Sequence, residues 1–170
     1  MRYAELALSP QANGNYLTRG TINGRAVRFL IDTGASFVTV PERLKGALGL
    51  SRGTYFKVRT ANGVVGNYAT RIEQLSIGPL ALREVPGALN PHDSDDTVLL
   101  GMSALRGFEL MQSHGQLILR QPADYAQHAA EASPGSTPML GMPLFKRPLS
   151  ACMRSDKLVD ARVLACMEGR

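Results

Sequence analysis

An acidic residue at the end of an apolar run constrains this chain more than any other feature. Residues 29–40 read F-L-I-D-T-G-A-S-F-V-T-V. The apolar residues 29–31 predict a buried strand, and Gly34 allows the tight turn that follows it. Asp32 is then left at the end of the strand with its carboxylate facing a cavity. Asp before Thr-Gly also caps many ordinary turns, so this triplet alone is weak evidence for chemistry.

Two further segments strengthen the interpretation of Asp32. Residues 98–105 read V-L-L-G-M-S-A-L, in which a short buried strand containing Leu99 and Leu100 runs into Gly101 and then a helix. Midway between the two motifs, residues 59–66 read R-T-A-N-G-V-V-G. Asn-Gly between apolar residues is a strong hairpin-turn signal in its own right.

Together, the D-T-G-A-S segment, the central hairpin and the downstream L-L-G resemble the retropepsin-like aspartic proteases. In that family the second strand threads beside the Asp loop and the hairpin forms a flap. Residues 115–119 are similar to the family's strand after the helix, and the match covers about residues 15–120. The resemblance is greatest to the small bacterial single-domain members. It implies a closed β-barrel with a flap hairpin and one or two short helices, acting as a homodimer.

The strand pattern leads to the same fold class without the resemblance. Short β-rich runs are separated by Gly and Pro through the first 120 residues, which predicts an all-β domain. Two short helices are expected at residues 41–48 and 103–110. The expected strands are residues 16–22, 26–31, 37–40, 55–60, 64–77, 98–100 and 117–119.

The chain divides into three predicted parts. Residues 1–14 form an N-terminal extension, residues 15–120 the protease-like domain, and residues 121–170 a C-terminal tail. Within the tail, residues 129–138 are rich in Ala, Ser and Pro and predict a linker. A helix is expected at residues 156–167, where apolar residues form a partial face.

Peptide hydrolysis by carboxylates needs two of them, one ionised to take a proton from water and one protonated to polarise the scissile carbonyl. This chain supplies one. A search for a second Asp-Thr/Ser-Gly finds none, and Asp93-Ser94-Asp95 lacks the glycine that the turn requires. An active enzyme is therefore expected to be a homodimer, with Asp32 of each subunit meeting on the two-fold axis.

The resemblance also implies roles for residues around Asp32 and in the flap. The hydroxyl of Thr33 would bond across to the other subunit's Asp loop, and the amide of Gly34 would bond a carboxylate oxygen. Ala61, Asn62 and Gly63 at the flap tip would close over an extended peptide and supply backbone hydrogen bonds.

Ala35 leads to an expectation about working pH. Pepsin-like relatives carry Ser or Thr three residues after their Asp, and that hydroxyl can bond the ionised carboxylate and favour its charged form. Alanine cannot do so. The pair should therefore stay singly protonated to higher pH, which predicts a mildly acidic to near-neutral activity optimum.

Composition argues against several other functions. The net charge is +5, but the basic residues are scattered singly, which favours a solvated surface over a nucleic-acid interface. His92, His114 and His128 lack metal-ligand spacing, and residues 92–96 lack the glycine and distal glutamate of a calcium loop. No metal and no cofactor are expected. Cys152 and Cys166 could bridge each other or remain free thiols.

No stretch approaches the roughly 18 apolar residues of a membrane span. Residues 1–6 include Glu5 where a signal peptide would be apolar, so a cytoplasmic location is expected, although bacterial relatives are often membrane-anchored and periplasmic.

Four hypotheses for function follow from the sequence. The leading one is a homodimeric aspartic endopeptidase that takes a peptide or protein substrate. The second is a retropepsin-like dimer that binds peptides or acts as a scaffold, with negligible cleavage because the tail or flap blocks the cleft. A nucleic-acid-binding β-domain rests only on the basic pI, and an unrelated β-protein would carry D-T-G by chance.

Overall fold

The computed structural model describes residues 2–131 and 146–170. Its strands are β1 (Tyr3–Leu8), β2 (Leu17–Ile22), β3 (Arg25–Ile31), β4 (Val38–Pro41), β5 (Tyr55–Thr60), β6 (Gly63–Ile77), β7 (Leu80–Asn90), β8 (Thr97–Leu100), β9 (Glu109–Ser113), β10 (Gln116–Pro122) and β11 (Leu158–Val159). Its helices are the 3-10 helix η1 (Glu42–Leu44), α1 (Met102–Leu105), α2 (Ala123–Glu131), α3 (Leu149–Cys152) and α4 (Ala161–Glu168).

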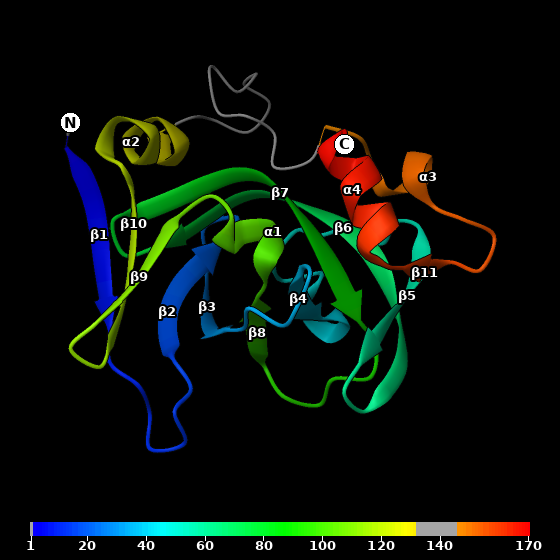
Figure 1. Ribbon diagram of the computed structural model, residues 1–170, viewed down its shortest axis with the longest axis horizontal. Coiled ribbons are helices and arrows are strands. Elements are labelled where there is room, and N and C mark those ends of the chain that lie inside the picture. Colours follow the sequence, from blue (N-terminus) through cyan, green and yellow to red (C-terminus); the bar gives the residue numbers. More distant parts are fainter. Residues whose placement is uncertain (1, 132–145) are drawn as a thin grey trace.

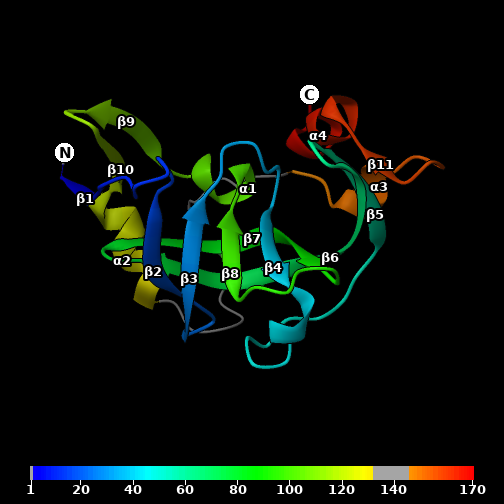
Figure 2. The ribbon, with the colours of Figure 1, turned by 90° about the horizontal axis from the view of Figure 1, so that it is seen from below.

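Six strands form a closed β-barrel, as expected from the sequence. They pair in the order β6-β2-β3-β8-β4-β7, and β6 also pairs with β7, which closes the ring. Figure 2 shows β2, β3, β8 and β4 side by side, with the long strands β6 and β7 crossing behind them. The hairpin β5–β6 extends from the barrel as the predicted flap.

The barrel is filled by apolar side chains from every strand of the ring. On β3, Phe29 is fully buried, and the parallel neighbour β8 contributes Val98 and Leu100. The interior also receives Ile22, Val38, Val40, Ile72, Leu75, Ile77, Leu80, Leu82, Val85 and Leu89. Burying this apolar area is the main driving force for the fold and fixes the position of the loop that follows β3.

A second sheet, β1-β10-β9, lies at one end of the barrel, and the C-terminal helices lie at the other (Figures 1 and 2). The boundary expected after residue 120 falls within β10, whereas the one after residue 14 lies in the loop between β1 and β2. β1, from the expected extension, pairs antiparallel with β10, and Ala4 lies opposite Gln121. Gln121 is buried, and its side-chain amide bonds both backbone groups of Ala81, at 2.7 and 3.0 Å.

The C-terminal residues 146–170 pack against the flap strand. β11 pairs in parallel with β5 through Leu158 and Val159, opposite Lys57 and Val58. A small apolar cluster joins the two parts and contains Phe37, Phe56, Ala88, Leu149, Cys152, Val159, Val163 and Met167. Cys152 and Cys166 form a disulfide that links α3 to α4.

Several expected elements differ from the structure. The helix expected at 41–48 is only the 3-10 turn η1, and the one expected at 103–110 ends early because Gly107 follows α1 and the chain then enters β9. The helix expected at 156–167 is β11 followed by α4, which begins after its N-cap Asp160.

The expected linker at 129–138 is helical over its first three residues, which end α2; its remaining residues lie outside the described part of the chain. Among the strands of the described segments, four were not expected, namely β1, β7, β9 and β11.

Candidate active site

Asp32 directly follows β3, where the strand leaves the barrel. Its backbone amide donates a hydrogen bond to the carbonyl of Leu100 at 3.1 Å, and Ile31 donates to Tyr16 at 2.9 Å. These bonds fix the strand end between β2 and β8. The register of β3 and β8, with Leu30 opposite Leu99, therefore determines where the Asp32 carboxylate projects.

The loop after Asp32 turns back on the carboxylate. Oδ1 of Asp32 accepts a hydrogen bond from the backbone amide of Gly34 at 2.9 Å, and the amide of Ala35 donates to the Asp32 carbonyl at 3.2 Å. A β-carbon at Gly34 would lie 3.1 Å from Oδ1, so glycine leaves room for this turn. Asp32 is partly buried, whereas Thr33 and Gly34 are exposed on this single chain.

The second predicted motif lies directly against this loop. A β-carbon at Gly101 would lie 2.7 Å from the carbonyl oxygen of Ala35, and the amide of Met102 donates to that oxygen at 2.8 Å. Glycine is therefore required at 101, because any side chain would push the Asp32 loop away.

Ser103, which the sequence analysis did not single out, also holds the loop. Its side chain is fully buried, and its Oγ accepts a hydrogen bond from the amide of Val38 at 2.8 Å, while its own amide donates to Ser36 at 2.9 Å. Its place two residues after Gly101, among apolar residues, is the only signal that could have indicated this role.

The flap turn is shifted by one residue from the expected Asn62-Gly63. Thr60 pairs with Gly63, so the two central residues of the hairpin are Ala61 and Asn62. Gly63 has a φ of 113°, which an L-residue rarely adopts. The hydroxyl of Thr60 accepts from the Asn62 amide at 3.2 Å and donates to the Gly63 carbonyl at 2.9 Å.

A cleft of about 400 Å³ separates the Asp32 loop from the flap. The two groups of residues predicted from the sequence thus meet across one space, since Asp32, Gly34 and Ala35 line it on one side and Ala61 on the other. Leu99 also lines it. The remaining lining residues are Ser36, Phe37, Thr39, Val58, Arg59, Thr60, Val65, Asn67, Ala88 and Asn90.

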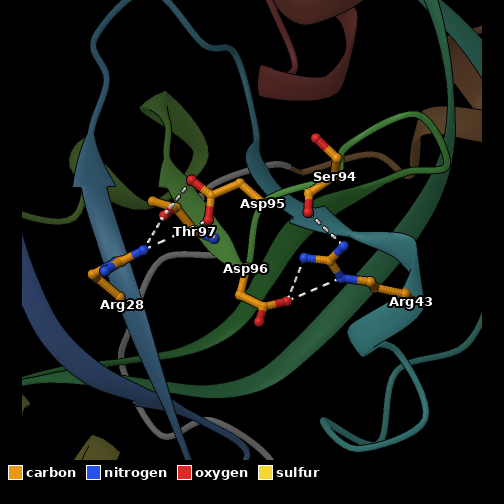
Figure 3. Close-up of polar contacts among 6 residues, drawn as sticks. All are labelled: Arg28, Arg43, Ser94, Asp95, Asp96 and Thr97. Atoms are coloured by element: carbon orange, nitrogen blue, oxygen red, sulfur yellow. Dashed lines mark hydrogen bonds and ion pairs between the residues drawn. The ribbon is translucent and has the colours of Figure 1, made fainter.

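The acidic residues Asp95 and Asp96, directly before β8, make structural contacts. Figure 3 shows Asp95 beside Arg28 of β3 and Asp96 beside Arg43 of η1. The hydroxyl of Thr97 donates to Asp95 at 3.1 Å, which holds the pKa of that carboxyl below its ordinary value. These contacts tie the start of β8 to β3 and η1.

Within residues 2–131 and 146–170, no group of three or more His, Cys, Asp or Glu side chains is arranged to hold a metal ion. None of the helices in these segments has the length and apolar character needed to cross a membrane.

This architecture is that of a retropepsin-like aspartic protease. It combines a closed barrel, the D-T-G loop, Gly101 packed against that loop, and the flap. The chain belongs to the "gag-polyprotein putative aspartyl protease" family, whose model matches residues 18–107. This confirms the resemblance identified from the sequence.

The chain is also similar to a curated protein and to two solved structures. A Sinorhizobium protein described as "Uncharacterized protein in cobV 5'region" is 31% identical over 111 residues, which are 64% of this chain and 48% of the relative. The matched part of the chain thus spans about half the length of that curated relative.

The crystal structure of a retropepsin-like aspartic protease from Rickettsia conorii superposes with a TM-score of 0.59 at 24% identity, over 70% of this chain and 92% of that one. This likeness establishes the fold. The retroviral protease-like domain of Ddi1 from Leishmania major matches at 18% identity with a TM-score of 0.35, too low to support an argument.

Proposed function

We propose that this protein is a homodimeric aspartic endopeptidase that hydrolyses peptide bonds between the two Asp32 carboxylates of the dimer. The observation that carries the proposal is the position of Asp32, which lines the cleft opposite the flap. It is also the only acidic side chain among the described residues that line this cleft. Since the chemistry needs a pair of carboxylates, the second must come from another copy of the chain.

The two carboxylates would share one proton, because like charges about 3 Å apart do not both ionise. The ionised carboxylate takes a proton from water, whose oxygen attacks the scissile carbonyl carbon while the protonated carboxylate donates a hydrogen bond to the carbonyl oxygen. The tetrahedral intermediate then collapses. The C–N bond breaks as the dyad returns a proton to the leaving nitrogen.

The exposure of the loop supports this pairing. Thr33 and Gly34 are both exposed on the single chain, so a second loop can approach them without displacing core residues. The Thr33 hydroxyl would then bond the partner's loop and keep the two carboxylates coplanar. The flap turn at Ala61 and Asn62 would cover an extended peptide and add backbone hydrogen bonds to it, as a strand adds to a sheet edge.

Cleavage of a mixed peptide library by the wild type and by Asp32→Asn tests the proposal. The amide is nearly the same size but can neither accept the water's proton nor share one, so cleavage should be lost while the circular dichroism spectrum and oligomeric state are retained. Cleavage by the purified mutant at the wild-type rate would exclude the mechanism. A strongly salt-dependent retention on DNA would instead favour nucleic-acid binding.

A second candidate is a peptide-binding or scaffolding dimer with negligible cleavage. It is favoured by one observation, the pairing of β11 with the flap strand at Val58, which itself lines the cleft. A flap held in this way would close slowly over a substrate. This candidate predicts that wild type and Asp32→Asn bind the same peptides and that neither cleaves them.

A further inference from the structure

Asn67 has an unusual environment for a polar side chain. It lies on β6, opposite Phe56 of β5, and only 4% of its surface is exposed. Its Oδ1 is buried and accepts no hydrogen bond from any residue that the structure describes. Buried side-chain oxygens in folded proteins almost always have a partner, so this one needs an explanation.

The other two polar residues that are buried as whole residues in the described part of the chain, Ser103 and Gln121, do have partners. The hydroxyl of Ser103 accepts from Val38, and the amide of Gln121 bonds Ala81 in both directions. Packing does not require an amide at position 67 either, since its neighbours along the cleft include Val58, Val65 and Ala88. An apolar side chain would avoid the cost of burying an unpaired acceptor.

The unpaired oxygen belongs to the substrate cleft. Asn67 and Val65 are two residues apart on one strand and therefore face the same side, and both line the cleft with Asp32. Two other polar side chains that line the cleft already make hydrogen bonds within the protein. Thr39 donates to the Phe37 carbonyl at 3.2 Å, and Asn90 accepts from the His92 amide at 2.9 Å.

We propose that Asn67 is a specificity-determining residue whose Oδ1 accepts a hydrogen bond from a neutral donor side chain of the substrate, an amide or a hydroxyl. This inference rests on the proposed peptide-binding cleft. An acidic side chain has no proton to offer at neutral pH. A buried Lys or Arg would lack a compensating charge, because Asp32 is committed to the dyad and Arg59 is the other charged residue of the lining.

The test compares wild type, Asn67→Leu and a matched control, Thr70→Val. Thr70 lies on the same strand, and its hydroxyl is also buried without a partner in the described part of the chain. It lines a different hollow, beside Leu149 and Met167, so Thr70→Val removes a buried oxygen without changing the cleft. Each protein is profiled with a peptide library in which one position at a time carries Gln, Asn, Ser, Leu, Met or Lys.

Wild type should prefer Gln, Asn or Ser over Leu and Met at one substrate position by about tenfold, the value of one net hydrogen bond. Asn67→Leu should remove or reverse this preference, and Thr70→Val should keep it. If Asn67→Leu does not fold, Asn67→Asp provides the readout, since its carboxylate should raise cleavage of peptides carrying Lys. If the protein cleaves peptides but its side-chain preference is unchanged by Asn67→Leu, or by Asn67→Asp, the inference is overturned. The proposed endopeptidase function would still hold.

Binding of the same peptides to Asp32→Asn separates the two proposals. If no peptide is cleaved by the wild type but binding shows the Asn67-dependent preference, the endopeptidase proposal fails and the inference holds. If there is neither cleavage nor an Asn67-dependent binding preference, both fail.

Discussion

The backbone amide of Met102 donates a 2.8 Å hydrogen bond to the carbonyl oxygen of Ala35, three residues after Asp32. This contact is possible because Gly101 has no side chain, as its β-carbon would lie 2.7 Å from the same oxygen. The geometry of the candidate active site therefore depends on a residue that does not itself line the cleft.

The first prediction is that Gly101→Ala disrupts this contact. Forcing a methyl group into a packed site should cost about 1–3 kcal/mol of unfolding free energy and displace the Asp32 loop. The midpoint temperature of thermal unfolding and the rate of peptide cleavage should both be lower than in the wild type. Gly46→Ala is the matched control, because its β-carbon would meet nothing within 4 Å and its backbone is not left-handed. Equal behaviour of the two variants would contradict the proposed role of Gly101.

The sequence predicted this part of the structure well, for a physical reason. The D-T-G loop and L-L-G are local patterns that need glycine at close backbone contacts, so their residue types reveal the geometry. β7 was not predicted. Its alternation is obscured by Pro86 and Gly87 in mid-strand and by Glu84, which has a left-handed φ of 55°.

The unpaired state of the Asn67 Oδ1 within residues 2–131 and 146–170 also could not be predicted. It depends on which side chains β5, β6 and β7 bring together along the cleft, and no local sequence pattern encodes that arrangement. The same holds for the docking of β11 on β5, which joins residues about a hundred positions apart.

The second prediction concerns Ala35, which lines the cleft beside Asp32. Wild type should work best at mildly acidic to near-neutral pH. Ala35→Ser should move the optimum downward, because a hydroxyl that bonds the ionised carboxylate favours the charged form. The measurement is the pH profile of kcat/KM for both proteins. A wild-type optimum below about pH 4, near the ordinary carboxyl value, or no acid shift in the variant, would refute this explanation.

The third prediction concerns the Cys152–Cys166 disulfide, which joins two residues 14 positions apart next to the flap strand. Reduction should lower the stability of the docked C-terminal segment by up to about 3 kcal/mol, the value for a loop of this size. Thermal unfolding with and without reductant measures it. A Cys152→Ser/Cys166→Ser double variant should not respond to reductant, and a wild type that also fails to respond would contradict the prediction.

The same disulfide leads us to propose an oxidising compartment in place of the cytoplasm expected from the sequence, since disulfides persist in oxidising surroundings. Trapping of free thiols during cell lysis tests this proposal. Two modified thiols per chain would restore the cytoplasmic expectation.

The fourth prediction is that docking of the C-terminal segment weakens in acid. Asp160 caps α4, and the bond from the Val163 amide at 3.0 Å is the main reason that its pKa lies below the ordinary value. A lowered pKa stabilises the folded state above the unfolded carboxyl value, and that contribution is lost as pH falls through the folded value. The protection of α4 amides from hydrogen exchange, measured relative to the intrinsic exchange rate at each pH, should therefore decrease at low pH. Asp160→Asn should flatten this dependence, and an unchanged acid response in the variant would assign it to another group.

The central claim is that each active site needs Asp32 from two chains, and mixed dimers test it most directly. Wild type is unfolded and refolded with increasing amounts of Asp32→Asn, so that the chains redistribute among dimers. At an equal mixture, only about a quarter of the dimers carry two Asp32 residues, and activity per wild-type chain should fall to about half and approach zero as the mutant is added in excess. Activity that stays proportional to the amount of wild-type chain would show that one subunit suffices, and would contradict the dimeric aspartic mechanism.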